Sequence, residues 1–220
     1  TLQNIVATSL TAANFGTNWF LNGTSGNDII RGTSGADTIS GLGGNDKIIG
    51  DFGADTIDGG VGIDTIYYSD STAGVNVNLI LTSSTAQTGG YAAGDKLANI
   101  ENVTGSAFVD TLTANATGST LDGGDGNDTL NGGAGNDIII GGKGYDIING
   151  GAGIDTASYA SSLSAVIIFL WGTQQFNGDA QGDQLTNIEN IIGSNFNDTI
   201  AGNSGANTID GIGGIDMVSY

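Results

Sequence analysis

The sequence contains no cysteine, no proline and no histidine, and only four lysine and arginine residues among 220. Without histidine and cysteine, the chain has no Ser-His-Asp or Cys-His triad, no zinc site built on those ligands and no disulfide framework. Four cations cannot form the basic patch that nucleic-acid binding requires, so we expect no nucleic-acid partner. The longest apolar run, 165–171, is far shorter than the ~20 residues of a transmembrane helix, so we expect no transmembrane segment.

Glycine and aspartate are present in excess. The chain has 40 glycines and 23 acidic residues, and its formal net charge is −19. Only Glu101 and Glu189 are glutamates. Glycine-rich acidic chains often stay unfolded because they bury little apolar surface. Here, however, 38% of the residues are hydrophobic and they recur at regular intervals, which indicates internal repeats.

A nine-residue repeat occupies three blocks of the chain. A complete unit has glycine at its first and fourth positions, aspartate at its sixth and an aliphatic residue at its eighth, as in 23–31. The blocks are 23–67, 105–158 and 193–220. The sixth-position aspartates, which are the candidate metal ligands, are Asp28, Asp37, Asp46, Asp55, Asp64, Asp110, Asp128, Asp137, Asp146, Asp155, Asp198 and Asp216. Ser119 and Asn207 depart from this pattern.

The segments outside the blocks complete the expected domain organisation. We expect 1–22 to cap the first block, and 68–104 and 159–192 to form β spacers. Asn-Ile-Glu-Asn recurs in both spacers with an offset of 88 residues, at 99–102 and 187–190. The third block stops where the next spacer would begin, so we expect it to be truncated. Within the spacers, 75–79 alternates as a half-buried strand, whereas we expect 166–171 to be buried on both faces.

Two further expectations concern side chains that the repeat leaves unassigned. We expect four aromatic residues to plug the ends of the blocks, and they are Tyr68, Tyr159, Phe108 and Phe196. We expect the aspartates outside the sixth position to be mostly solvated, as aspartate usually is. They are Asp51, Asp58, Asp70, Asp95, Asp122, Asp125, Asp179, Asp183 and Asp210.

The repeat predicts a parallel solenoid. Six glycine-rich residues form a turn, because glycine allows positive φ, and three residues around an aliphatic side chain form a very short strand. Two units then make one coil with two facing strands. Successive coils stack Ile30, Ile48 and Ile66 on one side, and Ile39 and Ile57 on the other.

The same stacking places aspartates 18 residues apart about 4.8 Å from one another, which is one strand spacing. Such a column of carboxylates would repel itself, so the fold needs a cation between the turns. Calcium accepts 6–8 carboxylate and carbonyl oxygens, whereas magnesium demands stricter geometry and transition metals prefer nitrogen or sulfur ligands. An EF-hand is excluded because Gly133 stands where the loop beginning at Asp122 needs glutamate.

These units resemble the RTX (repeats-in-toxin) family, also called hemolysin-type calcium-binding repeats. The resemblance implies an all-β fold, a parallel β-roll in consecutive blocks, with roughly five to seven calcium ions held by aspartates and turn carbonyls. It implies that aspartates 18 residues apart share an ion, in the pairs Asp28/Asp46, Asp37/Asp55, Asp46/Asp64, Asp110/Asp128, Asp128/Asp146, Asp137/Asp155 and Asp198/Asp216.

The resemblance also implies an extracellular or cell-surface protein, exported by type I secretion, that folds on meeting calcium. We expect a structural segment of an adhesin or surface-layer protein, with self-association or surface polysaccharide as further partners. The alternative is an accessory module of a secreted enzyme, polysaccharide-binding as in alginate epimerases. Catalysis by paired carboxylates in this chain is the least favoured hypothesis, because the periodic aspartates are assigned to metal. We therefore expect no enzyme activity.

Overall fold

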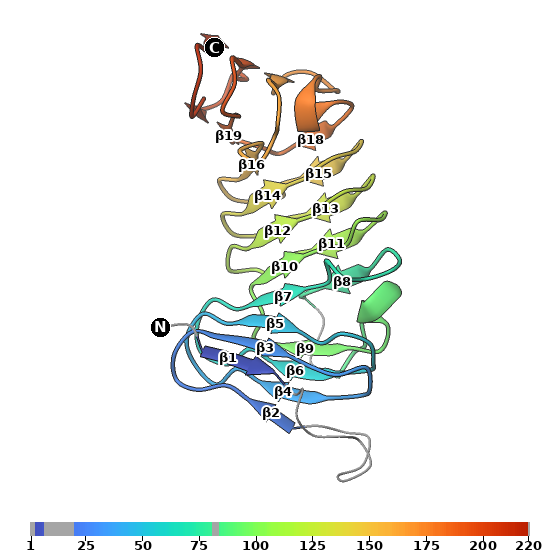
Figure 1. The fold of residues 1–220 in the computed structure, drawn as a ribbon. Helices are drawn as coiled ribbons and strands as arrows, with labels where there is room; N and C mark the ends of the chain where they lie inside the picture. Colours follow the sequence, from blue (N-terminus) through green and yellow to red (C-terminus); the bar gives the residue numbers. More distant parts are fainter. Residues whose placement is uncertain (1–2, 7–19, 81–83, 220) are drawn as a thin grey trace.

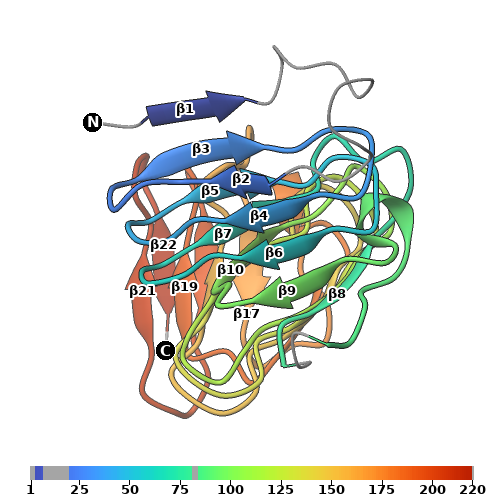
Figure 2. The same ribbon diagram turned by 90° about the horizontal axis from the view of Figure 1, so that it is seen from below.

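The computed structural model describes residues 3–6, 20–80 and 84–219, which wind into a stack of coils (Figure 1). Each coil places one short strand on each of two facing sides, as the view along the stack shows (Figure 2). One side is a continuous ten-stranded parallel sheet. In spatial order its strands are β1 (Gln3–Val6), β3 (Asp28–Arg31), β5 (Lys47–Ile49), β7 (Thr65–Tyr67), β10 (Asn102–Thr104), β12 (Thr120–Asp122), β14 (Ile138–Ile140), β16 (Thr156–Ser158), β19 (Asn190–Ile192) and β21 (Thr208–Asp210).

The opposite side is divided, in the described part of the chain, among three smaller parallel sheets. The first consists of β2 (Phe20–Asn22), β4 (Thr38–Ser40), β6 (Thr56–Asp58) and β9 (Lys96–Ala98). The second consists of β8 (Asn76–Asn78), β11 (Thr111–Thr113), β13 (Thr129–Asn131), β15 (Ile147–Asn149) and β18 (Gln184–Thr186). The third consists of β17 (Ile167–Phe169), β20 (Thr199–Ala201) and β22 (Met217–Ser219).

The core is a row of aliphatic side chains along each side. The middle residue of a strand points inward, and the strand pairing aligns Ile30 with Ile48 and Ile48 with Ile66. Ile39 aligns with Ile57 on the facing side, and all five side chains are buried. The predicted stacking is therefore confirmed. Each such side chain contributes about 1.5–3 kcal/mol on burial. Because the core is only one side chain deep on each side, the stability of the fold depends on the number of coils.

Both spacers are built into the stack. After β7 the chain moves forward to β8, which pairs with β11 of the next block. It then passes through a short 3-10 helix, η2 (Gly90–Ala92), and returns to β9, which pairs with β6 of the block behind. The second spacer repeats this path with β17, η3 (Gly178–Ala180) and β18. A spacer thus adds a coil and joins two blocks by strand pairing. The domain boundaries stay a prediction.

Burial in the spacer strands follows the alternating pattern in both copies. Val75 and Val77 are buried, as the alternation at 75–79 predicts. In the second spacer Val166 and Ile168 are buried, but Trp171 is 70% exposed. The expectation that 166–171 is buried on both faces is wrong, because only one face of this strand meets the core.

The start of the chain contributes two strands. β1 pairs with β3, and β2 pairs with β4, so both lie against the first repeat coil. Residues 7–19 of the expected cap lie outside the described residues, and the cap stays a prediction. Within the described ranges, no helix has the length and apolar character needed to cross a membrane.

Candidate metal centre

The sixth-position aspartates form hydrogen-bonded columns along the stack. The backbone N–H of Asp28 donates to Oδ1 of Asp46 at 2.8 Å, and that of Asp46 donates to Oδ1 of Asp64 at 2.8 Å. The same bond joins the other predicted pairs, Asp37/Asp55, Asp110/Asp128, Asp128/Asp146, Asp137/Asp155 and Asp198/Asp216. These aspartates are buried, except for Asp216, which is partly exposed. The structure therefore brings together every pair that the repeat spacing relates.

One carboxylate oxygen in many of these turns is buried and, within the described residues, accepts no hydrogen bond. This oxygen is Oδ2 of Asp46, Asp55, Asp64, Asp128, Asp137, Asp146 and Asp155. Oδ1 of Asp28 shares this condition. An ionised carboxylate that is buried without a partner costs on the order of several kcal/mol. Each such oxygen therefore needs either a proton or a cation.

The protonation equilibria of these aspartates reflect that cost. Burial, with smaller contributions from the carboxylates of Asp95 and Asp37, raises the pKa of Asp55 from 3.8 to about 8, against a backbone hydrogen bond that lowers it. Burial likewise raises the pKa of Asp128 to about 7. The same cause raises the pKa of Asp64 to about 6. Without a cation beside them, these buried carboxylates would hold protons more tightly than solvated aspartates do.

Backbone carbonyls from the next coil lie beside the unpartnered oxygens. A Cβ added to Gly132 would meet both Oδ2 of Asp137, at 2.6 Å, and the carbonyl oxygen of Gly150. A carboxylate and a carbonyl oxygen therefore flank the same small space, which only glycine leaves open. Among the described residues, five unpartnered carboxylates have such a carbonyl, in the pairs Asp46/Gly59, Asp64/Asn99, Asp128/Gly141, Asp137/Gly150 and Asp155/Asn187. An all-oxygen donor set of this kind suits calcium.

The backbone divides the turns into two kinds. In what we call open turns, the second position has a left-handed φ between 64° and 100°. These positions are Leu42, Asp51, Gly60, Gly124, Gly133, Gly142, Gly151 and Ile212. In what we call capped turns, the second residue is Thr, Ser or Asn, and its side chain accepts the N–H two residues on. These residues are Thr24, Thr33, Ser106, Asn115, Ser194 and Asn203.

Capped turns supply hydrogen-bond donors to their own carboxylates, although Oδ1 of Asp28, in the turn capped by Thr24, still has no partner in the described chain. The backbone N–H of Ser106 donates to Oδ2 of Asp110 at 2.5 Å, and its hydroxyl donates to Oδ1 at 2.7 Å. The backbone N–H and the hydroxyl of Ser194 donate to Oδ2 and Oδ1 of Asp198 in the same way. In open turns, no residue that the structure describes donates to Oδ2 of a buried aspartate. Each block begins with two capped turns, so the twelve predicted ligands fall into two classes that the repeat spacing does not distinguish.

The capped geometry explains the phenylalanines in the repeat. Phe108 and Phe196 occupy the fourth position of capped turns, where the backbone has no positive φ, so glycine is not required there. Both side chains are substantially exposed, at 47% and 43%. The expectation that they plug the ends of the blocks is therefore wrong. Tyr68 and Tyr159 are buried, by contrast.

On the side of the small sheets, the columns of the first and second blocks each end at an aspartate that lies outside the repeat pattern. Oδ1 of Asp95 accepts the N–H of Asp55 at 2.9 Å, and its Oδ2 accepts the hydroxyl of Tyr68 at 2.9 Å. Asp183 accepts the N–H of Asp146 and the hydroxyl of Tyr159 in the same manner. Both aspartates are 0% exposed, so the expectation that they are solvated is wrong. Their shared 88-residue offset was the signal in the sequence that could have identified them.

The columns on the other side end at glutamate. Oε2 of Glu101 accepts the N–H of Asp64 at 2.9 Å. Glu189 accepts the N–H of Asp155 at the same distance. Sequence reasoning found their motif but gave it no role. In 3–6, 20–80 and 84–219, no three His, Cys, Asp or Glu side chains gather into a metal-binding group, so carbonyl oxygens have to complete each coordination shell.

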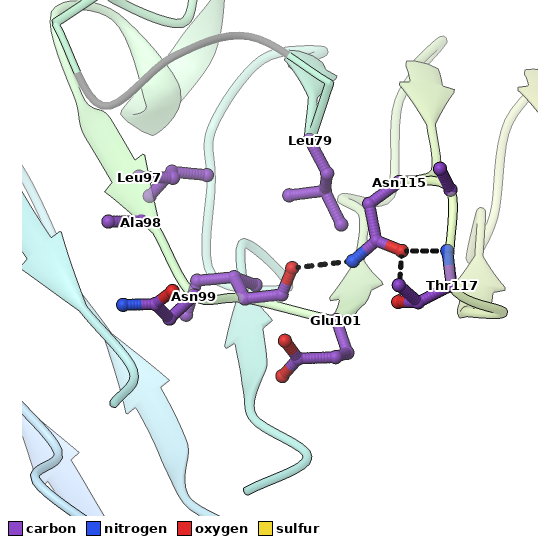
Figure 3. Close-up of a pocket in the computed structure, with 9 residues that line it drawn as sticks. Leu79, Leu97, Ala98, Asn99, Glu101, Asn115 and Thr117 are labelled. Carbon is purple, nitrogen blue, oxygen red and sulfur yellow. Dashed lines mark hydrogen bonds between the residues drawn. The ribbon is translucent and has the colours of Figure 1, made fainter. Parts of the chain in front are cut away.

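A hollow of about 410 Å³ lies where the first small sheet ends at β9 and the second begins at β8 (Figure 3). Leu79 and Leu97 line it, together with Glu101 and Asn115. The side-chain amide of Asn115 donates to the carbonyl of Ile100 at 3.2 Å, which ties the first capped coil of the second block to the spacer turn. The end of the first column therefore borders this hollow.

The fold and its oxygen donors define a parallel β-roll of calcium-binding type. The chain matches the family model of the RTX calcium-binding nonapeptide repeat (4 copies) over residues 22–57, 31–66, 104–139, 122–157 and 186–218. These ranges span more than half of the chain, which therefore belongs to this family of calcium-binding repeats. No curated protein matches the chain.

Proposed function

We propose that this chain is a calcium-dependent structural segment of a secreted or cell-surface protein. The observation that carries the proposal is the set of buried Oδ2 atoms in the open turns, which accept no hydrogen bond within the described residues. In the metal-free state these carboxylates oppose the fold. Calcium supplies the missing partner, coordinated by the sixth-position aspartates and the carbonyls of adjacent turns.

Support for five ions comes from the five places in the described chain where an unpartnered carboxylate faces a carbonyl. Asp55 and Asp146 supply unpartnered oxygens at two more turns, which raises the number to seven. Capped turns other than that of Asp28 need no cation for their aspartates, because the capping residue donates to the carboxylate. Five divalent ions would reduce the net charge from −19 to about −9, which removes much of the repulsion.

Metal binding on this scale is large enough to control folding. At a calcium concentration ten times the dissociation constant, each site contributes about 1.4 kcal/mol, so five contribute about 7 kcal/mol. A small domain has a total stability of about 5–15 kcal/mol. Extracellular calcium modules bind with dissociation constants of about 10⁻⁴–10⁻³ M. The chain would then stay unfolded where calcium is scarce and fold outside the cell.

In that setting the stack acts as a stiff scaffold within an adhesin or surface-layer protein and has no catalytic role. The continuous ten-stranded sheet supports a scaffold, because it joins all three blocks without a flexible linker in the described chain. An accessory module of a secreted enzyme is the alternative. It predicts calcium-dependent binding of an acidic polysaccharide such as alginate, which isothermal titration calorimetry would detect as heat.

Equilibrium dialysis against calcium tests the proposed function directly. We expect about five to seven ions per chain at millimolar calcium, with magnesium failing to replace them. Fewer than two bound ions at ten millimolar calcium would contradict the proposal. Light scattering in the same samples would show whether calcium also drives self-association of the chain.

A further inference from the structure

The first block ends in a turn that is half as long as the repeat turns. The turn at 59–64 links β6 to β7 in six residues, whereas 99–101 links β9 to β10 in three. β9 pairs with β6, and β10 pairs with β7, so the short turn lies directly on the long one. Asn102 is in register with Thr65. Glu101 therefore occupies the next place in the column after Asp64.

The short turn brings three kinds of oxygen together. Oε2 of Glu101 accepts the backbone N–H of Asp64 at 2.9 Å. Oδ2 of Asp64 is buried and, among the described residues, has no hydrogen-bond partner. A Cβ added to Gly59 would meet this Oδ2 at 2.6 Å and would also meet the carbonyl oxygen of Asn99. The small space between a carboxylate and a carbonyl oxygen, which we call the cradle, is thus present here as well as between the repeat turns.

The local backbone is shaped to present this carbonyl. Asn99 has a left-handed φ of 49°, which few residues other than glycine adopt. Its side-chain amide donates to Oδ1 of Asp58 at 2.7 Å, which holds the residue in that conformation. A three-residue turn protrudes less than a six-residue turn. Glutamate has one methylene more than aspartate, so the carboxylate of Glu101 reaches the level that aspartate reaches in the repeat turns.

The second block ends in the same way. Glu189 accepts the N–H of Asp155 at 2.9 Å, and Oδ2 of Asp155 likewise has no partner in the described chain. A Cβ at Gly150 would meet that Oδ2 at 2.6 Å and the carbonyl oxygen of Asn187, which has a φ of 51°. The two glutamates of the chain, against 21 aspartates, therefore stand at this one structural position.

We propose that Glu101 and Glu189 are calcium ligands that close the last site of each block. The ion would be shared by the glutamate, the preceding aspartate (Asp64 or Asp155) and the asparagine carbonyl. This inference rests on the proposed function. The ends of the other columns differ, because the hydroxyl of Tyr68 already occupies Oδ2 of Asp95. A block would thus end in a metal site on one side and in a tyrosine–aspartate pair on the other.

Substitution of glutamate by glutamine separates this role from simple hydrogen bonding. Glu101→Gln keeps an oxygen that accepts the N–H of Asp64, but it removes the charge that a calcium site requires. Equilibrium dialysis should show one ion fewer per chain in this variant, and two fewer in Glu101→Gln/Glu189→Gln. Asp70→Asn is the matched control, because it removes one charge from an exposed side chain in the spacer and should leave the number unchanged.

An unchanged number and affinity in both glutamine variants would show that the glutamates only accept hydrogen bonds, and would overturn the inference. A wild-type chain that binds no calcium would instead refute the proposed function itself. If the variants fail to fold, crystals of the wild-type chain grown in calcium provide the second measurement. An anomalous calcium peak between Asp64 and Glu101 is expected, and peaks at the repeat turns without one here would overturn the inference.

Discussion

The hydroxyl of Tyr68 donates a 2.9 Å hydrogen bond to Oδ2 of Asp95, 27 residues further along the chain, and both side chains are buried. Tyr159 and Asp183 repeat this pair at 3.0 Å in the second spacer. The tyrosine follows the last strand of a block, and the aspartate precedes the strand that turns back to that block. The pair therefore ties the returning segment of each spacer to the block behind it.

Removal of the hydroxyl should weaken this closure. Tyr68→Phe leaves Oδ2 of Asp95 buried without a donor, so we expect a loss of about 1–3 kcal/mol in the free energy of unfolding. Urea denaturation in saturating calcium would measure it. Tyr145→Phe is the matched control, because Tyr145 is 61% exposed, and it should change stability by less than about 0.5 kcal/mol. Equal losses of stability in the two variants would contradict the conclusion that the Tyr68–Asp95 hydrogen bond ties the spacer to the block behind it.

The two kinds of turn should respond differently to the same substitution. Asp46→Asn removes the charge from an open turn whose Oδ2 has no partner in the described chain, so calorimetry should show the loss of at least one calcium ion. Asp37→Asn acts on a capped turn, where Thr33 already donates to Oδ2. Asn207 occupies such a turn naturally and accepts the N–H of Asn203. We therefore expect the ion count to stay the same in Asp37→Asn, and a loss there equal to that in Asp46→Asn would contradict the division.

Glycine at the first position should be needed for metal binding where a cradle exists. In Gly132→Ala, the added Cβ would meet Oδ2 of Asp137 at 2.6 Å and the carbonyl of Gly150. We expect the loss of one ion and a destabilisation of about 1–3 kcal/mol from overpacking. Gly26→Ala is the control, because its nearest neighbour would be Oγ1 of Thr24 at 3.9 Å. Calcium titrations of both variants make the comparison, and intact binding by Gly132→Ala would refute the cradle.

Acid should stabilise the metal-free fold. Burial raises the pKa of Asp55 to about 8 and that of Asp128 to about 7, from 3.8 in solvated aspartate. The folded state thus binds more protons than the unfolded state, and its stability falls as the pH rises through this range. In calcium-free buffer we expect more β signal at pH 5 than at pH 8. Calcium affinity should change in the opposite direction, because protons compete for the same oxygens. A metal-free fold that is more stable at pH 8 would contradict this.

Periodicity was sufficient to predict the solenoid and the aspartate columns. The nine-residue spacing alone places Ile30 on Ile48 and Asp28 near Asp46. It could not reveal the capped turns, because the alignment rests on glycine and aspartate and ignores the second position, where Thr33 decides the outcome. Nor could it place Asp95, whose burial depends on a chain that moves forward to β8 and then returns to β9. That path results from long-range pairing rather than from any local pattern.

Folding in the presence and absence of calcium tests the central claim most directly. Far-UV circular dichroism of the chain should show little β structure in excess chelator at pH 7.5 and a cooperative gain between about 0.1 and 1 mM calcium, the range of extracellular modules. Chelator should reverse the gain, and magnesium at the same concentration should not produce it. A full β signal in excess chelator would show that the buried carboxylates do not need an ion, and would contradict the account.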